Sequence, residues 1–81
     1  MRVIIIPSDG VVSIDGEARG PLGLSFMAEI HAVQWYGAWG EVEYRSLDAA
    51  PYNERITSLA PYQKAIDAWN NWTPPELPSW P

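Results

Sequence analysis

A chain of 81 residues is one domain, near the size at which a single hydrophobic core only just offsets conformational entropy. It has no cysteine and one histidine, which excludes a disulfide framework and a thiolate metal site, and we expect no metal or other cofactor. Ten acidic residues against five basic ones give a net charge of −5, and the basic residues are spread along the chain, so nucleic acid is not an expected ligand.

No segment reads as a membrane anchor or a signal peptide. The longest apolar run covers residues 3–6, far short of the roughly 20 residues that a membrane-spanning helix needs. The N-terminus lacks the apolar region and cleavage site of a secreted protein. We therefore expect a soluble chain made in the cytoplasm. Five tryptophans supply apolar area for a core or an interface, so association in a homo- or hetero-oligomer is expected.

The chain begins with a predicted strand pair. Residues 2–6 are rich in β-branched side chains, and their unbroken apolar run predicts a strand that is buried on both faces. The segment from Pro7 to Gly10 turns the chain, and residues 11–14 read as the returning strand. The dipeptide Asp15-Gly16 tolerates the positive φ angles of a type I′ turn, after which a third strand could start.

Residues 19–29 predict a loop rather than a strand. Leu22, Leu24 and Phe26 alternate, but the glycines and the proline around them argue against regular pairing. We expect these three apolar side chains to fold over an open end of the sheet.

Residues 30–44 read IHAVQWYGAWGEVEY and predict an aromatic hairpin that turns at residues 37–40. The two-residue period of a strand places on one face His31, Val33 and Trp35, and on the other Ile30, Ala32, Gln34 and Tyr36. In the second strand Val42 and Tyr44 point inward, whereas Glu41 and Glu43 face water. Trp39 lies at the tip of the turn, where an exposed indole is a favoured anchor for a partner.

One helix is predicted near the C-terminus, from Pro61 to Trp72, after an irregular loop over residues 45–52 and a short strand over residues 53–57. Pro61 suits the first helical turn, because the amide donor that it lacks would be unpaired there. Apolar residues recur at i, i+3, i+4 and i+7 and form a stripe toward the sheet: Tyr62, Ala65, Ile66 and Trp69. We expect this stripe to join Trp35 and Tyr44 in the core.

Residues 73–81 form a predicted proline-rich arm beside a single domain of residues 1–72. Four prolines remove amide donors and favour an extended polyproline II conformation: Pro74, Pro75, Pro78 and Pro81. The predicted partner-binding residues combine this arm with exposed tryptophans: Trp39, Trp72, Pro74, Pro75, Leu77, Pro78 and Trp80. Packing against its own domain is the alternative for each of the three tryptophans.

The sequence offers no convincing catalytic group. His31 could pair with Glu29, or with Glu41 and Glu43 across the hairpin, since opposed strand residues approach to about 5 Å. No suitably placed nucleophile supports such chemistry, so we interpret His31 as a strand histidine satisfied by a neighbour. We predict that the chain is not an enzyme and has no catalytic residues.

Three blocks follow one another along residues 1–70: MRVIIIPSDGVVSIDG, HAVQWYGAWGEVEY and NERITSLAPYQKAIDAW. In this order they resemble a group of small proteins encoded near the tail-fibre genes of tailed bacteriophages and prophages. The resemblance implies a tail-region role, with other tail or tail-fibre proteins as partners and the virion tail as location. The chain would be either a structural adaptor in the particle or a tail-fibre assembly chaperone that is absent from it. The segment TPPELPSWP lies outside the resemblance.

The expected fold is α+β and mainly β. It consists of a small twisted antiparallel sheet or half-open barrel of about four or five strands, with one C-terminal helix and the extended arm.

Overall fold

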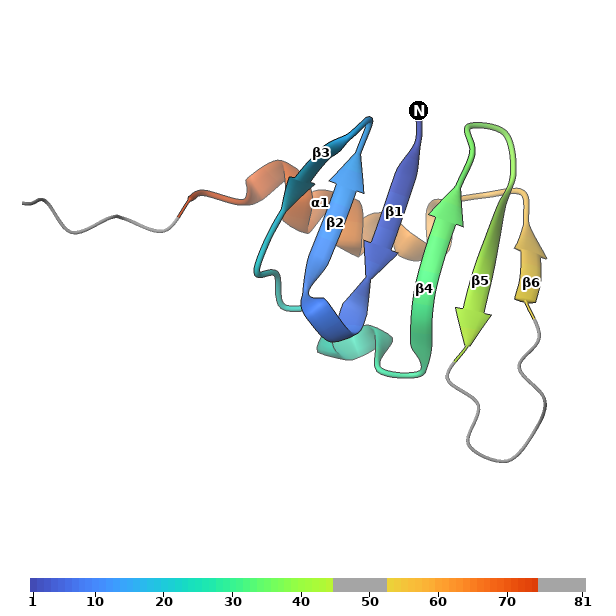
Figure 1. The fold of residues 1–81 in the computed structure, drawn as a ribbon, viewed down its shortest axis with the longest axis horizontal. Coiled ribbons are helices and arrows are strands. Elements are labelled where there is room, and N and C mark those ends of the chain that lie inside the picture. The colour runs from blue at the N-terminus through green and yellow to red at the C-terminus, as the bar shows by residue number, and fades with distance from the viewer. Residues whose placement is uncertain (45–52, 75–81) are drawn as a thin grey trace, which may run out of the picture.

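The computed structural model describes residues 1–44 and 53–74, which form one antiparallel sheet with a helix on one side (Figure 1). The strands are β1 (Val3–Ile6), β2 (Val11–Ile14), β3 (Glu17–Arg19), β4 (Ile30–Trp35), β5 (Gly40–Tyr44) and β6 (Asn53–Ile56). A 3₁₀ helix, η3 (Ala60–Tyr62), leads into α1 (Gln63–Asn71). A mainly β fold with a C-terminal helix is therefore confirmed.

The predicted count of four or five strands was wrong, and the sheet is not a closed barrel. The sheet has six strands in the order β3-β2-β1-β4-β5-β6, so β3 and β6 are its edges and lie at opposite sides (Figure 1). Closure would require these two edges to pair, but each is very short, with three residues in β3 and four in β6. The predicted loop over residues 45–52 lies outside the described residues.

The first turns form as predicted. Pro7 opens a 3₁₀ helix, η1 (Pro7–Asp9), which ends at Gly10 with a φ of 64°. The tight turn between β2 and β3 has positive φ at both central residues, 50° at Asp15 and 89° at Gly16. The Asp15 carboxylate also accepts a hydrogen bond from the backbone N–H of Arg2 at 2.8 Å, which ties this turn to the start of β1.

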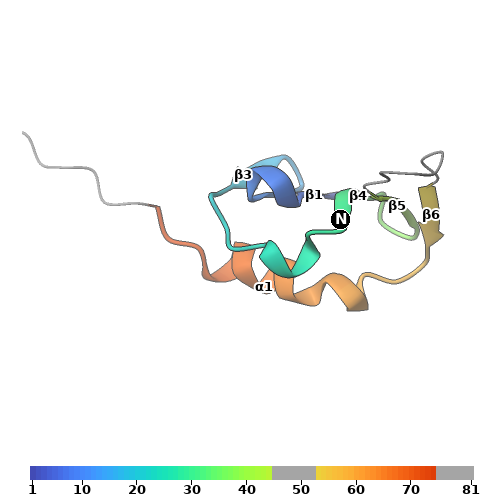
Figure 2. The ribbon, with the colours of Figure 1, turned by 90° about the horizontal axis from the view of Figure 1, so that it is seen from below.

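Within residues 1–44 and 53–74, helices cover one face of the sheet. Figure 2 shows α1 and the short 3₁₀ helix η2 (Ser25–Met27) on the same side of the strands. The strand side chains with no solvent exposure point to that side: Val3, Ile5, Val12, Val33 and Val42. Burial of β1 on both faces was therefore a wrong prediction, because Ile4 and Ile6 face the side without a helix and are only partly buried.

The loop before β4 packs on the core as predicted for Leu22 and Leu24, but Met27 takes the place predicted for Phe26. Leu24 and Met27 are buried, Leu22 is partly buried against them, and Phe26 is 53 % exposed. In a 3₁₀ turn residues i and i+3 lie on the same side, so Leu24 and Met27 point inward together while Phe26 turns to solvent.

A β-bulge in β4 reverses the predicted faces at the start of the strand. Ile30 pairs with Tyr44 and Ala32 with Glu43, so His31 is the additional residue. An additional residue shifts the two-residue alternation. Ile30 consequently packs against the core and His31 is exposed, whereas Val33 and Trp35 are buried as predicted.

Pro61 lies in η3, the 3₁₀ helix before α1, and Trp72 lies just after α1, so the α-helix is shorter than the predicted range from Pro61 to Trp72. The predicted apolar stripe faces the sheet. Tyr62, Ala65 and Ile66 are buried, and Trp69 is partly buried against the core. Trp69 covers the β3 edge, where its Nε1 donates to the carbonyl oxygen of Glu17 at 2.9 Å and its ring stacks under the Arg19 guanidinium at 3.7 Å.

Tyr62 predicts a loss of stability at alkaline pH. Burial raises the pKa of this phenol above its ordinary value of 10.0, nearby Glu54 adds to the rise, and a side-chain hydrogen bond with Tyr44 opposes it. The unfolded chain therefore loses this proton at a lower pH than the folded chain. The stabilisation is fully present below 10.0 and is lost as pH rises through the folded-state pKa.

We expect the free energy of unfolding, measured by denaturant titration at about pH 9 and about pH 11, to fall less in Tyr62→Phe than in the parent. Tyr36→Phe, which removes an exposed phenol, is the matched control and should behave like the parent. If the free energy of unfolding of Tyr62→Phe fell with pH as much as that of the parent, Tyr62 would not be the source of the alkaline loss of stability.

Candidate functional site

The turn between β4 and β5 brings two aromatic rings together on the surface. The backbone N–H of Tyr36 donates to the carbonyl oxygen of Trp39 at 2.8 Å, and Gly37 between them has a φ of 113°. The ring centroids of Tyr36 and Trp39 lie 4.7 Å apart with the planes inclined by 36°. A Cβ atom at Gly40 would collide with the carbonyl oxygen of Gln34, so the tight approach of the strands after this turn requires glycine.

Two arginines extend this aromatic pair. The Arg2 guanidinium carbon lies 4.3 Å from the centroid of the Tyr36 ring, and that of Arg55 lies 4.7 Å from the Trp39 ring. We call these four residues, Arg2, Tyr36, Trp39 and Arg55, the aromatic ladder. Cation–π contacts of this kind stabilise the arrangement by about 0.5–1 kcal/mol each at exposed sites. The predicted exposed indole of Trp39 is thus held in place by its neighbours and is not a lone side chain at the turn.

The ladder lies on the face of the sheet opposite α1. Arg55 pairs with Glu41, Glu41 with Gln34, and Gln34 with Ile4 in one row across four strands. Val33 precedes Gln34 and Val42 follows Glu41, and both valines are buried on the helix side. Since successive side chains of a strand point to opposite faces, the row points away from the helix.

Polar side chains fix one end of the ladder. Gln34 Oε1 accepts from Arg2 Nη2 at 3.1 Å and from the Tyr36 hydroxyl at 3.3 Å. Arg2 Nη1 also donates to the carbonyl oxygen of Trp35 at 3.0 Å. These hydrogen bonds fix the Arg2 guanidinium over the Tyr36 ring.

The other end of the ladder is less constrained. Glu41, which lies across from Arg55, accepts a long hydrogen bond from Asn53 Nδ2 at 3.4 Å. Within residues 1–44 and 53–74 the Arg55 guanidinium forms no hydrogen bond or ion pair and has only the Trp39 stacking contact. Its N–H donors are therefore available to a carboxylate from outside the described residues.

Exposed apolar side chains gather at the same end of the sheet. In the part of the chain that the structure describes, the exposed large hydrophobic residues are Met1 at 59 %, Phe26 at 53 %, Tyr36 at 43 % and Trp39 at 36 %. A Cβ on Gly37 would lie 3.8 Å from backbone atoms of Met1, so Met1 adjoins the ladder, whereas Phe26 belongs to η2 on the helix side. Clustered exposed aromatics of this kind mark interaction sites.

The structure does not bring all the predicted binding residues together. Trp39 belongs to the ladder, near the β6 edge. Trp72 follows α1 on the β3 side, is partly buried and donates its backbone N–H to the Trp69 carbonyl at 3.4 Å. Pro74 is exposed. The remaining predicted residues lie outside the described residues: Pro75, Leu77, Pro78 and Trp80.

Sequence reasoning missed three members of the ladder. Tyr36 and Trp39 flank a glycine in the turn, a spacing that could have indicated their contact. Arg2 and Arg55 come from distant parts of the sequence, and only the strand order β1-β4-β5-β6 brings them beside the aromatic pair.

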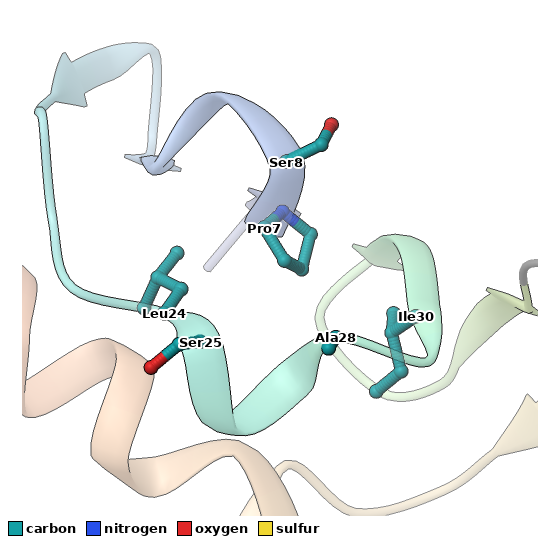
Figure 3. Close-up of a pocket in the computed structure, with 6 residues that line it drawn as sticks. All are labelled: Pro7, Ser8, Leu24, Ser25, Ala28 and Ile30. Atoms are coloured by element: carbon teal, nitrogen blue, oxygen red, sulfur yellow. The ribbon is translucent and has the colours of Figure 1, made fainter.

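A pocket of about 300 Å³ lies between η1 and η2, away from the ladder (Figure 3). Its lining combines four apolar residues with two serines: Pro7, Ser8, Leu24, Ser25, Ala28 and Ile30. None of the described residues that line it is a histidine, a carboxylate or a cation, the side chains that act as general bases or stabilise an oxyanion beside a serine nucleophile.

Neither a metal site nor a membrane span is found in the described ranges. Within residues 1–44 and 53–74 no three His, Cys, Asp or Glu side chains come together as metal ligands. In the same ranges no helix has the length and apolar character for crossing a bilayer. Comparisons with protein families, with curated proteins and with solved structures found no match.

Proposed function

We propose that this chain is a phage tail adaptor that binds other tail or tail-fibre proteins through the aromatic ladder, with the proline-rich arm as a second contact. The observation that carries the binding role is the ladder itself, a cluster of Tyr, Trp and Arg side chains exposed beside Met1 and held in one arrangement. The tail assignment is supported by the resemblance of residues 1–70 to proteins encoded near tail-fibre genes.

The arrangement of the rings favours a protein partner over a sugar. A sugar stacks on an open aromatic face, but Tyr36 and Trp39 stack against each other and each also carries a guanidinium. A ligand therefore meets ring edges and N–H donors. Trp, Tyr and Arg are the residue types that dominate binding energy at protein interfaces. Because the ladder is ordered before binding, less conformational entropy is lost on association.

The direct test is capture of purified tail and tail-fibre proteins, one at a time, on the immobilised full-length chain. We expect retention of at least one of them by the parent and by Phe26→Ala, which removes an exposed aromatic outside the ladder. Failure of every tail and tail-fibre protein to bind the parent would contradict the proposed function.

The arm predicts a separation of folding from binding. A chain that stops after Trp72 keeps the hydrogen bond between Trp72 and Trp69 and loses Thr73 and Pro74, which are exposed. We expect its thermal unfolding to match that of the parent and its capture of the tail protein to be lost. Unchanged capture would remove the arm from the account, and a lower melting temperature would show that the arm packs on its own domain.

A further inference from the structure

The two edges of the sheet differ in how they are covered. At β3, the Trp69 indole donates to the carbonyl oxygen of Glu17, and Arg19 Nη1 donates to the carbonyl oxygen of Trp69 at 2.9 Å, so the end of α1 is fastened to this edge. At β6, strand pairing with β5 is on one side, and no described residue pairs with the other side. An unpaired strand edge is a template for another extended segment.

Arg55 gives this edge a cation that forms no ion pair with a described residue. It belongs to β6 and stacks on Trp39, and no carboxylate lies within ion-pair distance of it in the described ranges. The chain as a whole is acidic, with a net charge of −5. At physiological ionic strength charges are screened beyond about 8 Å, so a docking segment responds to the nearest groups: the Arg55 guanidinium, which has no ion pair in the described ranges, and the carboxylates of Glu41 across the strand pair and of Glu54 beside it.

We propose that β6 docks an extended acidic segment of a partner protein, which adds a strand to the sheet and places an aspartate or glutamate opposite Arg55. The segment's next side chain would point to the helix side, where Ile56 packs against the core, so an apolar residue fits there. This inference rests on the proposed function and deepens it, because it specifies the chemistry of the partner.

A second copy of the chain fits this edge poorly. When two β6 strands pair antiparallel about a two-fold axis, one residue lies opposite its own copy. In the registers with the greatest overlap of the two strands, that residue is Glu54 or Arg55. Like charges directly opposite each other destabilise a strand pair. The charge pattern therefore selects a different sequence as the occupant.

The first test uses peptide probes on the ¹⁵N-labelled full chain, followed by amide shifts in NMR spectra. The probes are peptides of about six residues that alternate valine with glutamate or valine with lysine. We expect the glutamate peptide to shift the amides of residues 53–56 and of the ladder, less so at high salt, and the lysine peptide to leave them in place. Equal shifts with both peptides, no shifts, or shifts confined to β3 would overturn the proposal.

The second test changes the charge of the edge. Arg55→Glu should weaken binding of the glutamate peptide by about tenfold and allow binding of the lysine peptide. Arg55→Gln should weaken binding of the glutamate peptide in the same way but should not bind the lysine peptide. Lys64→Glu is the matched control, since it makes the same change in net charge on the exposed side of α1. All three substitutions are on the surface, and parent-like melting curves would verify folding.

The two proposals fail in different ways. If Arg55→Glu captures the tail or tail-fibre proteins as well as the parent does, the acidic segment is wrong and the adaptor function stands. If the parent captures none of them while the peptide result is positive, the adaptor function is wrong and β6 binds acidic strands of another origin.

Discussion

Trp69→Ala is expected to lower the free energy of unfolding by about 2–4 kcal/mol, near the lower end of the range for deleting a large aromatic side chain, because Trp69 is only partly buried. The substitution removes three contacts at once: the packing against the core, the hydrogen bond to Glu17 and the ring under Arg19. Domains of this size are stable by only about 5–10 kcal/mol, so the loss is a large share of the total.

Thermal and denaturant unfolding of Trp69→Ala measure this effect, with an expected fall in melting temperature of more than about 8 °C. Trp69→Phe should fall between the parent and the alanine variant, because it keeps a ring and loses the indole N–H. Phe26→Ala, at an exposed aromatic, should melt close to the parent. A Trp69→Ala variant that also melts close to the parent would show that α1 does not fasten the β3 edge.

The double variant Tyr36→Ala/Trp39→Ala is expected to weaken capture of the tail or tail-fibre partner by at least about 100-fold, the equivalent of about 2.8 kcal/mol, as for interface residues that dominate binding. Both rings are on the surface, and the substitutions leave the buried residues of the adjoining strands, such as Trp35 in β4 and Val42 in β5, unchanged. We therefore expect the variant to fold and to retain the unfolding cooperativity of the parent.

Partner binding is measured for the parent, the double variant and Phe26→Ala at equal concentrations. This comparison distinguishes loss of the ladder from loss of any exposed aromatic side chain. The ladder requires that only the double variant fails. Equal binding by all three would place the interface elsewhere on the chain, with the arm as the remaining proposed contact.

The parts of the fold that were predicted correctly depend on residues close together in the sequence. The Asp15-Gly16 turn, the alternation of Val42 with Glu41 and Glu43, and the helical stripe around Ala65 and Ile66 each follow from local backbone geometry. The bulge at His31 leaves only a weak trace in the periodicity, the adjacent apolar residues Ala32 and Val33, where the two-residue alternation slips by one position. The partial exposure of Ile4 and Ile6 depends on which face the helix covers, and the sequence of β1 does not encode that choice.

The candidate site was predictable only at its centre. Trp39 was found because a tryptophan between glycines in a turn is exposed unless another segment covers it. Arg55 of β6 lies over the Trp39 ring and Arg2 lies over the neighbouring Tyr36 ring, and the strand order brings both arginines to the same end of the sheet. The interaction between Arg55 and Trp39 is therefore a product of topology, and no spacing in the sequence indicates it.

Quantitative mass spectrometry of purified virions is the most direct test of a tail adaptor that stays bound to its partners. Under the proposed function a phage or prophage encodes the chain, and the particles are its virions, prepared with the parent gene and with the Tyr36→Ala/Trp39→Ala gene. We predict that the parent chain is present at a constant ratio to the tail-fibre protein and that the double variant is lost from the particles. Absence of the parent chain from finished virions would contradict the structural role and would favour the tail-fibre assembly chaperone.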